Sequence, residues 1–440
     1  MKHAIFNSSR RLFVLGTASG IAAAALVGPV FAQPGQAEWA QKYDADEKLA
    51  VPRSSTPLLS PQSLQATEQT IQRYQQIVAG GGWKAVSGPT LKVGVRAPAV
   101  VALRERLMIS GDLDAQAGSS PVYDSYVEAG VKRFQARHGL GQTGVVAQQT
   151  YAALNIPAQV RLRQLETNLV RLRSFAGNLG RRYVTANIPA AMVETVENGQ
   201  IMTLHAAGVG KIDRQSPVMQ ARVLDINFNP FWTVPPSIIR KDLIPKMQAD
   251  PNYLTENKIR IYNKDNVELN PRQVNWNSLE ATNYRFRQDP GGDFNSLGVV
   301  RINIANPYGV YMHDTPAKGV FGDDYRFVSS GCMRLQNVRD YVAWLLKETP
   351  GWDRDKIDAA IASGERLDAK LVEAVPVYWV YVTAWGTPEG IAQFRDDIYQ
   401  RDGLGSVASA QAAPPSAPPP AGGKTSAAPG ALTPMQDEDE

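Results

Sequence analysis

The sequence predicts a multi-domain α+β chain, in which a helical first part precedes a mostly-β domain that carries an insertion. Two changes of hydrophobic periodicity indicate this class. Apolar residues recur at helical spacing up to about residue 182, and then alternate with polar residues from Tyr183 to Thr383. The alternation stops between residues 235 and 290, which we interpret as the insertion. A chain of 440 residues is long enough for two or three domains.

Residues 1–32 have the pattern of a twin-arginine signal peptide. Arg10 and Arg11 precede an apolar, Ala-rich run, and Val30 and Ala32 fit the positions that a signal peptidase reads. An uncleaved membrane anchor is the alternative, but the run is short and weakly apolar for a membrane span. We therefore expect export to the periplasm or cell envelope, with cleavage after Ala32 and no transmembrane segment in the mature chain.

Composition narrows the class of partner and the role of cysteine. Lys and Arg outnumber Asp and Glu by 46 to 42, an excess too small to indicate a nucleic-acid partner. The chain has a single cysteine, Cys332, so it forms no intramolecular disulfide and no Cys-rich zinc site. We expect no metal and no cofactor.

Residues 403–440 are mostly Ala, Pro, Gly and Ser and end in acidic residues, which predicts a disordered tail.

The helical part divides into three segments. Residues 33–89 contain a polar lead-in and a scaffold helix. That helix begins at Ser60 and ends at glycines 80–82, which lack the following Lys-Ser or Lys-Thr of a phosphate loop. Residues 90–156 hold three helical stretches, which predict a three-helix unit. Residues 157–182 are predicted to form one amphipathic helix, whose arginines either bind carboxylates or, as we favour, form a solvated face.

Residues 183–385 are predicted to form the mostly-β domain. Short alternating runs separated by turn residues are typical of strands in such a domain. Asn198-Gly199 between two of these runs predicts a type I′ hairpin. The expected strands are residues 183–188, 191–196, 200–207, 222–228, 299–304, 309–313 and 377–383.

Helices are expected at three places around these strands. One runs from residue 338 to 347, and Asn337 has the residue type of its N-cap. Residues 386–402 are predicted to be a C-terminal helix. Residues 235–290 form a helical, charged insertion that is too long for a passive connection, so we expect a lid.

The functional interpretation depends on Cys332. A lone cysteine is either a small buried hydrophobe or a reactive thiol. Ser329, Ser330 and Gly331 precede it in a tight polar turn, which favours an exposed side chain and unpaired N–H groups at Gly331 and Cys332. An exported protein with one unpaired thiol is unusual, because that compartment oxidises thiols. We therefore interpret Cys332 as a nucleophile.

A thiol with an unperturbed pKa of about 8.5 is only slightly ionised at neutral pH, so the nucleophile needs a base. His3 lies in the signal peptide and His138 in the three-helix unit. His205 lies inside a strand pattern, which indicates a packed or surface residue. His313 ends an apolar strand, where catalytic groups often lie. We expect His313 to form an ion pair with the thiolate, and a backbone carbonyl near Asp314 to orient the ring.

The three-helix unit resembles the type-1 peptidoglycan-binding domain. The order of Phe-Gln, Gly-Leu, Gly and Thr residues carries the resemblance. Most matching positions are core or turn residues, so they imply the fold more strongly than they imply wall binding. The matching residues are Val100, Leu103, Leu107 and residues 131–135, 138–140, 143–146, 150–151 and 154.

The segments around the histidine and the cysteine resemble the active-site signature of L,D-transpeptidases of the YkuD type. The matching runs are residues 311–316, Tyr-Met-His-Asp-Thr-Pro, and residues 330–334, Ser-Gly-Cys-Met-Arg. Residues 227–238 are similar to the strand-and-entry segment of the YcbB-like branch. That branch also carries a peptidoglycan-binding domain and a substrate-capping insertion. The short N-terminal scaffold and the twin-arginine signal are departures from the family pattern.

The resemblance implies a YkuD-like catalytic domain that cross-links peptidoglycan through a thioester. Cys332 would attack the diaminopimelate carbonyl of a tetrapeptide donor and release D-Ala. The amine of a second diaminopimelate would then resolve the thioester and form a 3→3 cross-link. The implied partners are peptidoglycan stem peptides, with a tetrapeptide donor and a diaminopimelate acceptor, and carbapenem β-lactams as inhibitors.

Physical chemistry assigns compatible roles to four residues. His313 serves as general base and then as general acid. The backbone N–H groups of Cys332 and Gly331 are the predicted oxyanion hole. Arg334 offers a forked donor to a substrate carboxylate.

The resemblance adds Tyr311 and Trp232, which should line the substrate groove, and Ser330, which should order the cysteine loop. There are four alternatives to the transpeptidase. Water or another amine can resolve a thioester, so the same site could act as an L,D-carboxypeptidase or anchor a protein to peptidoglycan. A non-catalytic wall-binding protein is disfavoured by the intact Cys, His and Arg. A papain-like protease is disfavoured because the residues around the cysteine lack that pattern.

Overall fold

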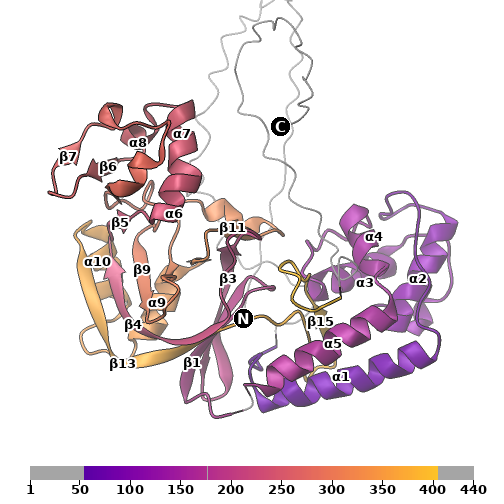
Figure 1. Ribbon diagram of the computed structural model, residues 1–440. Helices are drawn as coiled ribbons and strands as arrows, with labels where there is room; N and C mark the ends of the chain where they lie inside the picture. The colour runs from indigo at the N-terminus through magenta and orange to yellow at the C-terminus, as the bar shows by residue number, and fades with distance from the viewer. Residues whose placement is uncertain (1–53, 176, 405–440) are drawn as a thin grey trace, which may run out of the picture. The chain divides into compact units, whose positions relative to one another are not determined.

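The computed structural model describes residues 54–175 and 177–404. The predicted signal peptide, most of the lead-in and residues 405–440 lie outside these ranges. The described chain begins with helices and continues into a β-rich part (Figure 1). The first helices are α1 (Pro61–Ala79), α2 (Pro98–Ser110), α3 (Ser125–Arg137), α4 (Gln148–Leu154) and α5 (Ala158–Arg173), with a 3₁₀ turn η2 (Ala115–Ala117) between α2 and α3.

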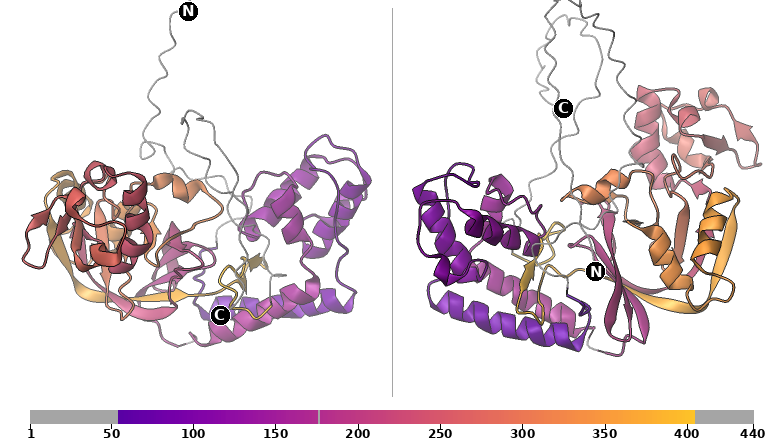
Figure 2. Two further views of the ribbon diagram at one scale, coloured as in Figure 1. Left: turned by 45° about the horizontal axis from the view of Figure 1, so that its top comes forward. Right: turned by 180° about the vertical axis from the view of Figure 1, so that it is seen from behind.

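The scaffold helix α1 begins and ends where the sequence predicts. The Ser60 hydroxyl accepts a hydrogen bond from the Ser63 N–H at 3.1 Å, which satisfies one of the free donors at the helix start. The chain leaves the helix at Gly80, and Gly81 and Gly82 follow with φ of 94° and 71°. The helix packs against α5, and the two run side by side in both views of Figure 2.

The helices α2, α3 and α4 share a hydrophobic core of their own. Val100 and Leu103 from α2, Val131 and Phe134 from α3, and Leu154 from α4 are fully buried in it. These are the positions that the apolar spacing of the sequence identifies. The structure therefore contains the predicted three-helix unit.

The helix α5 is shorter than predicted, and its arginine face is only partly solvated: Arg163 and Arg173 are exposed, whereas Arg161 and Arg171 are covered. It ends at Arg173. Arg161 is only 2% exposed, and its Nη1 donates to Gln164 Oε1 at 2.9 Å. Arg171 donates to the buried Asp402 carboxylate at 2.5 Å. The segment near Asp402 covers part of this face, and the period of a helix cannot reveal that a distant part of the chain packs on it.

The β-rich part is a closed barrel of mixed strands. The strands follow the order β3-β12-β10-β9-β4-β13-β1-β2, the pairing of β2 with β3 closes the ring, and β11 pairs with β3 outside it. The predicted α+β class with a mostly-β second part is confirmed. The strands are β1 (Arg182–Asn187), β2 (Met192–Glu197), β3 (Gln200–Gly210), β4 (Met219–Phe228), β9 (Val300–Ile304), β10 (Met312–His313), β11 (Phe327–Ser329), β12 (Met333–Leu335) and β13 (Leu367–Val380).

The hairpin between β2 and β3 has the predicted turn. Asn198 and Gly199 both have positive φ, 52° and 75°, as a type I′ turn requires. Glu197 lies opposite Gln200 at the start of the antiparallel pairing.

One face of four adjacent strands, β4, β9, β10 and β12, packs in the main core with helix α9 (Val338–Leu346). Its buried side chains include Ile226, Ile302, Met312, Met333 and Tyr341, and the Tyr341 hydroxyl donates to the Met312 sulfur at 3.3 Å. Helix α10 (Arg354–Ala362) contributes to the same core. Because successive side chains of a strand project to opposite faces, the residues between these apolar ones project away from the core.

The insertion between β4 and β9 has a core and a sheet of its own. Its helices are present as predicted, but its strands were not expected, because runs of two to four residues are too short to show alternation. The strands pair in the order β5-β8-β6-β7. The elements are β5 (Trp232–Thr233), α6 (Pro236–Ile238), the π-helical turn η3 (Ile239–Leu243), α7 (Ile244–Ala249), α8 (Tyr253–Glu256), β6 (Ile259–Tyr262), β7 (Glu268–Leu269), η4 (Pro271–Gln273), η5 (Leu279–Asn283) and β8 (Arg285–Gln288). A further 3₁₀ turn, η6 (Lys318–Gly322), follows β10.

Two local predictions are wrong. Residues 386–402 form no helix, because the chain turns after β14 (Ala384–Gly386) and returns as β15 (Ala392–Phe394). A side chain at Gly386 would place its Cβ 2.3 Å from the Ala66 carbonyl oxygen, so close packing on α1 fixes this backbone. Asn337 precedes α9 with φ 50°, in the left-handed region, and its side chain makes no capping hydrogen bond.

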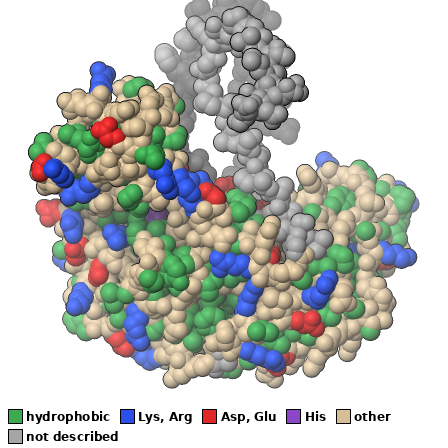
Figure 3. Space-filling model, in the orientation of Figure 1, with side chains coloured by type: hydrophobic (Ala, Val, Ile, Leu, Met, Phe, Trp, Pro, Cys, Tyr) green, Lys and Arg blue, Asp and Glu red, His purple; other side chains and the backbone are tan. Residues whose placement is uncertain are grey.

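The visible surface carries charges of both signs. On the face in Figure 3, Lys and Arg side chains are interspersed with Asp and Glu, in line with the net charge of +4. No helix within residues 54–175 and 177–404 is long and apolar enough to cross a membrane.

Candidate active site

The strand β10 lies at the centre of the site. It pairs with β9 on one side and with β12 on the other, which places His313 opposite Arg301 and opposite Arg334. Residues opposite one another in a sheet project from the same face. His313 therefore stands between two arginines, and all three project away from the main core.

Tyr311 lies beside Cys332 in the preceding row of the sheet. The Met333 N–H donates to the Tyr311 carbonyl at 3.1 Å, which extends the β10–β12 register beyond the two strands. Alternate residues share a face, so Tyr311 and Cys332 project on the side of His313 and Arg334. His313 and Cys332 are thus diagonal neighbours on adjacent strands.

The thiol of Cys332 contacts Tyr311, and the insertion reaches the same place. Tyr311 lies close enough to the sulfur for its backbone N–H and its hydroxyl to favour the thiolate, and the Trp232 side chain acts in the same way on that hydroxyl. Trp232 belongs to β5 of the insertion. The structure therefore brings Trp232, Tyr311 and Cys332 together into one chain of contacts.

The ionisation of the site differs from the expected ion pair. Burial raises the pKa of Cys332 to about 11, although Tyr311 and the two arginines favour the thiolate. Burial, followed by the positive charge of Arg334, lowers the pKa of His313 to about 3; Arg301 also lowers it. A charged imidazole would be a third cation between two guanidinium groups. At neutral pH the thiol and the imidazole are therefore both uncharged, and a neutral imidazole can accept a proton.

The ring of His313 is oriented by its neighbour, as the sequence suggests. Its Nδ1 hydrogen-bonds to the backbone carbonyl of Asp314, so Nδ1 carries the proton and Nε2 keeps its lone pair. The Asp314 carboxylate forms an ion pair with Lys318, and it accepts a hydrogen bond from the Val299 N–H at 3.0 Å. The expected carbonyl near Asp314 is confirmed.

The cysteine loop is braced by serines, which changes the predicted oxyanion hole. The Gly331 N–H donates to Ser329 Oγ at 3.1 Å, and Ser329 Oγ donates to the Cys332 carbonyl at 2.6 Å. The expectation that the Gly331 N–H is unpaired is therefore wrong, because the serine before it turns back on the loop. The Cys332 N–H bonds to no acceptor in the described part of the chain.

The exposed Ser330 connects the cysteine loop to the insertion through Arg214. Nη1 of Arg214 donates to Ser330 Oγ at 2.8 Å, and the same guanidinium holds both carboxylate oxygens of Asp242 at 2.5 and 3.0 Å. Asp242 belongs to η3 of the insertion. We name Arg214, Asp242 and Ser330 the clasp. Sequence reasoning missed Arg214, because nothing in its local pattern indicates a partner so distant in the chain.

His205 is a packed residue, as the strand pattern predicts. Its Nδ1 hydrogen-bonds to the Gln336 carbonyl at 3.0 Å and its Nε2 to the Thr203 hydroxyl at 2.7 Å. Burial lowers its pKa to about 4. Both ring nitrogens are occupied, so His205 has no free lone pair for a proton from a thiol.

Sequence reasoning also missed a row of polar residues beside the histidine. In β4 and β9, Asp225, Asn227, Arg301 and Asn303 alternate with buried apolar residues. The Asn303 side chain donates to Asp225 and to Asn227, the latter at 2.7 Å, and the Arg301 guanidinium lies 4.4 Å from the centre of the Tyr311 ring. The alternation was visible in the sequence, but the register that places these strands beside β10 was not.

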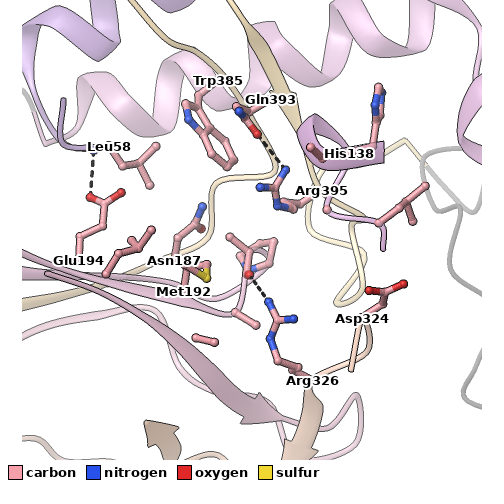
Figure 4. Close-up of a pocket in the computed structure, with 18 of the residues that line it drawn as sticks. Leu58, His138, Asn187, Met192, Glu194, Asp324, Arg326, Trp385, Gln393 and Arg395 are labelled. Atoms are coloured by element: carbon pink, nitrogen blue, oxygen red, sulfur yellow. Dashed lines mark hydrogen bonds between the residues drawn. The ribbon is translucent and has the colours of Figure 1, made fainter. Parts of the chain in front are cut away.

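A separate cavity of about 670 Å³ lies elsewhere in the molecule (Figure 4). Trp385, Arg326, Arg395 and Asp324 are among the residues that line it, and none of the predicted site residues does. It is therefore not part of the arrangement around Cys332. Within the described residues there is also no cluster of His, Cys, Asp and Glu that could hold a metal ion.

Comparison with known proteins gives two family matches. Residues 181–352 match a family described as the L,D-transpeptidase catalytic domain, and residues 96–154 match one described as "Putative peptidoglycan binding domain". A protein of Haemophilus influenzae named "Putative L,D-transpeptidase" is 33% identical over 220 residues. That alignment covers 50% of this chain and 44% of the relative, so the chain spans less than half the length of this curated relative.

Two solved structures are also similar. The L,D-transpeptidase (Yku) of Stackebrandtia nassauensis is 13% identical, with 69% of this chain and 100% of that chain covered and a TM-score of 0.27. An L,D-transpeptidase of Mycobacterium smegmatis is 16% identical, with 46% and 58% covered and a TM-score of 0.24.

Proposed function

We propose that the chain is a cysteine-dependent transpeptidase that forms 3→3 cross-links between peptidoglycan stem peptides. The matches of residues 181–352 to the L,D-transpeptidase catalytic domain and of residues 96–154 to a peptidoglycan binding domain support this proposal. The observation that carries the proposal is the placement of Cys332 and His313 as diagonal neighbours on one face of the barrel wall. A neutral imidazole with a free Nε2 beside a protonated thiol suits general-base activation of a nucleophile.

The first half of the reaction forms a thioester. The Cys332 sulfur attacks the diaminopimelate carbonyl of a tetrapeptide donor while its proton passes to His313 Nε2. The Cys332 N–H stabilises the developing oxyanion. The C–N bond to D-Ala then breaks, and the imidazolium returns the proton to the departing amine. Arg334, two residues from the nucleophile on the same face, binds a substrate carboxylate.

The second half transfers the acyl group. The amine of a second diaminopimelate attacks the thioester and gives a proton to His313, a new amide forms, and the C–S bond breaks to regenerate the thiol. Tyr311 and Trp232 line the groove beside the sulfur and limit the access of water. Water instead of the amine would make the protein an L,D-carboxypeptidase, and the amine of another protein would make it an anchoring enzyme. The intact Cys, His and Arg disfavour a non-catalytic wall-binding role.

The direct test uses purified mature protein and tetrapeptide stems. We expect dimers joined between two diaminopimelates, with one D-Ala released for each cross-link, identified by mass. Tripeptides without dimers would assign the carboxypeptidase reaction instead. A protein that neither trims nor joins the stems would contradict the proposal.

The place of action follows from the same proposal. A peptidoglycan substrate and the twin-arginine pattern of residues 1–32 support export to the periplasm and work in the cell envelope. Membership of the YcbB-like branch stays a prediction that the insertion between β4 and β9 supports.

Loss of the clasp is expected to shift products from dimers to tripeptides. Arg214→Gln removes the ion pair that ties η3 to the cysteine loop, so the insertion should cover the thioester less tightly and admit water. An ion pair of this exposure contributes about 1 kcal/mol, so we expect a several-fold rise in the tripeptide-to-dimer ratio. Mass analysis of products measures the ratio.

The matched control is Arg260→Gln. Arg260 forms an ion pair with Asp289 at 2.7 Å within the insertion, away from the cysteine loop. An unchanged ratio in Arg214→Gln, or an equal rise in both variants, would show that the clasp does not govern water access.

A carbapenem is expected to acylate Cys332. A nucleophilic thiol beside a free N–H donor should open a strained β-lactam, and the adduct should appear as a mass increase in the wild type and not in Cys332→Ala.

The pKa of His313 near 3 sets the pH dependence of this acylation. Above that pH the imidazole is a free base, so the acylation rate should hold from about pH 8 to pH 5 and fall only as pH approaches 3. A fall centred near pH 6.5, the ordinary value for histidine, would contradict this ionisation.

A further inference from the structure

Arg301 is a charged residue of the site to which the reaction above gives no role. It lies on β9 opposite His313, and its guanidinium stacks on Tyr311, the residue next to the Cys332 sulfur. It is half-buried. Its Nε is shielded from solvent and has no hydrogen-bond partner.

The charge of Arg301 is not balanced by the protein. No ion pair joins Arg301 or Arg334 to a carboxylate within residues 54–175 and 177–404. Two buried arginines elsewhere form ion pairs: Arg104 holds Asp124 and Arg137 holds Asp112, at 2.5 and 2.6 Å. Two others, Arg106 and Arg161, lie over aromatic rings instead. An unpaired charge in a partly desolvated site is costly, unless a ligand supplies the counter-charge.

The nearby carboxylates are committed to other groups. Asp314 is held by Lys318 and by the Val299 N–H. Asp225 accepts a hydrogen bond from Asn303. Two guanidinium groups on either side of a neutral histidine therefore give the site an excess of positive charge, which favours a substrate with two anionic groups.

The proposed donor carries two carboxylates, which lie at different distances from the reacting carbonyl. One belongs to the terminal D-Ala, directly beyond the bond that breaks. The other lies at the far end of the diaminopimelate side chain. Arg334 lies on the strand that follows Cys332, whereas Arg301 lies two strands away, across β10. The nearer guanidinium fits the nearer carboxylate, and the farther one fits the side-chain carboxylate.

We propose that Arg301 binds the side-chain carboxylate of the donor diaminopimelate and so makes the enzyme selective for stems in which that carboxylate is free rather than amidated. This inference rests on the proposed function. A forked guanidinium is suited to a carboxylate and offers nothing comparable to a neutral amide.

The test compares two tetrapeptide stems, one with the side-chain carboxylate free and one with it amidated. Binding is measured by calorimetry on the full chain carrying Cys332→Ala, which needs no turnover. We expect the free form to bind more tightly. Arg301→Gln in the same background should weaken the free form by roughly 10- to 100-fold, the worth of a hydrogen bond to a charged group, and leave the amidated form unchanged. Arg301→Lys should keep part of the preference.

Two controls separate this role from others. Arg334→Gln should weaken both stems equally, since both carry the terminal carboxylate. Arg366→Gln, which loses only an exposed ion pair with Asp368, should change neither. Melting curves identify variants that fail to fold. If Arg301→Gln fails to fold, the comparison of the two stems is made with Arg301→Lys instead.

The outcomes also separate this inference from the proposed function. A preference that survives Arg301→Gln, or an equal loss for both stems, overturns the role of Arg301. Dimers formed by the wild type with no preference between the stems overturn it as well, but leave the transpeptidase proposal intact. An Arg301-dependent binding preference without any dimers supports the carboxylate site and contradicts the transpeptidase.

Discussion

Cys332→Ala is expected to abolish dimer formation, with a fall in rate of roughly 10⁴-fold or more, as for the loss of a covalent nucleophile. Cys332 is the only cysteine in the chain, so no second thiol can replace it. Cys332→Ser should be nearly as inactive. A hydroxyl is far harder to ionise than a thiol, and this site already disfavours ionisation enough to hold the pKa of the thiol near 11. Dimers are counted by mass after incubation with tetrapeptide stems.

The alanine variant should remain folded, because the thiol is only half-buried at the edge of the main core and the substitution removes a single atom. A melting temperature close to that of the wild type would show that loss of chemistry, not of structure, explains the result. Dimers made by Cys332→Ala at the wild-type rate would mean that a different group attacks the stem.

Only those residues of the candidate site that lie within the two motifs could be predicted from the sequence. Cys332 and Arg334 are two residues apart at the start of β12, and Tyr311 and His313 two residues apart at β10, so each pair shares a face by the period of extended chain alone. Arg301 and Arg214 come from other segments. Arg301 is placed by the β9–β10 register and Arg214 by a contact with the insertion, and neither can be derived from local periodicity.

The fold shows the same division between local and distant determinants. Helix α1 was predicted through its cap at Ser60, and the β2–β3 hairpin through Asn198-Gly199, because both signals are local. The C-terminal helix was wrong because packing of Gly386 on α1 fixes the backbone there. The solvated face of α5 is correct for Arg163 and Arg173 but not for Arg171, because a segment more than 200 residues later covers it.

The ionisation of Cys332 and His313 was also beyond local reasoning. The two motifs suggest an ion pair between the cysteine and the histidine, and no local pattern contradicts it. Burial acts against both charged forms, and the arginines on either side of His313 add repulsion to the imidazolium. The result is a thiol and an imidazole that are both uncharged at neutral pH.

His313→Ala is expected to lower the rate of dimer formation by about 10²-fold or more, because it removes the general base of both half-reactions. The residual rate should rise with pH toward 11, since ionisation of the thiol by solvent then replaces transfer to the imidazole. The pH–rate profile of the variant, set beside that of the wild type, measures both effects.

His205 supplies a closely matched control for this prediction. It is buried like His313, its pKa is lowered by the same cause, and its Nδ1 also bonds to a backbone carbonyl. What differs is its place: His205 lies on β3, and its Nε2 is occupied by Thr203. His205→Gln should therefore change the rate by no more than about twofold once folding is verified by melting. If His205→Gln lost the activity and His313→Ala kept it, the base would have been assigned to the wrong histidine. Equal losses at matched stability would mean that burial of the ring, not its position beside the thiol, is what the reaction needs.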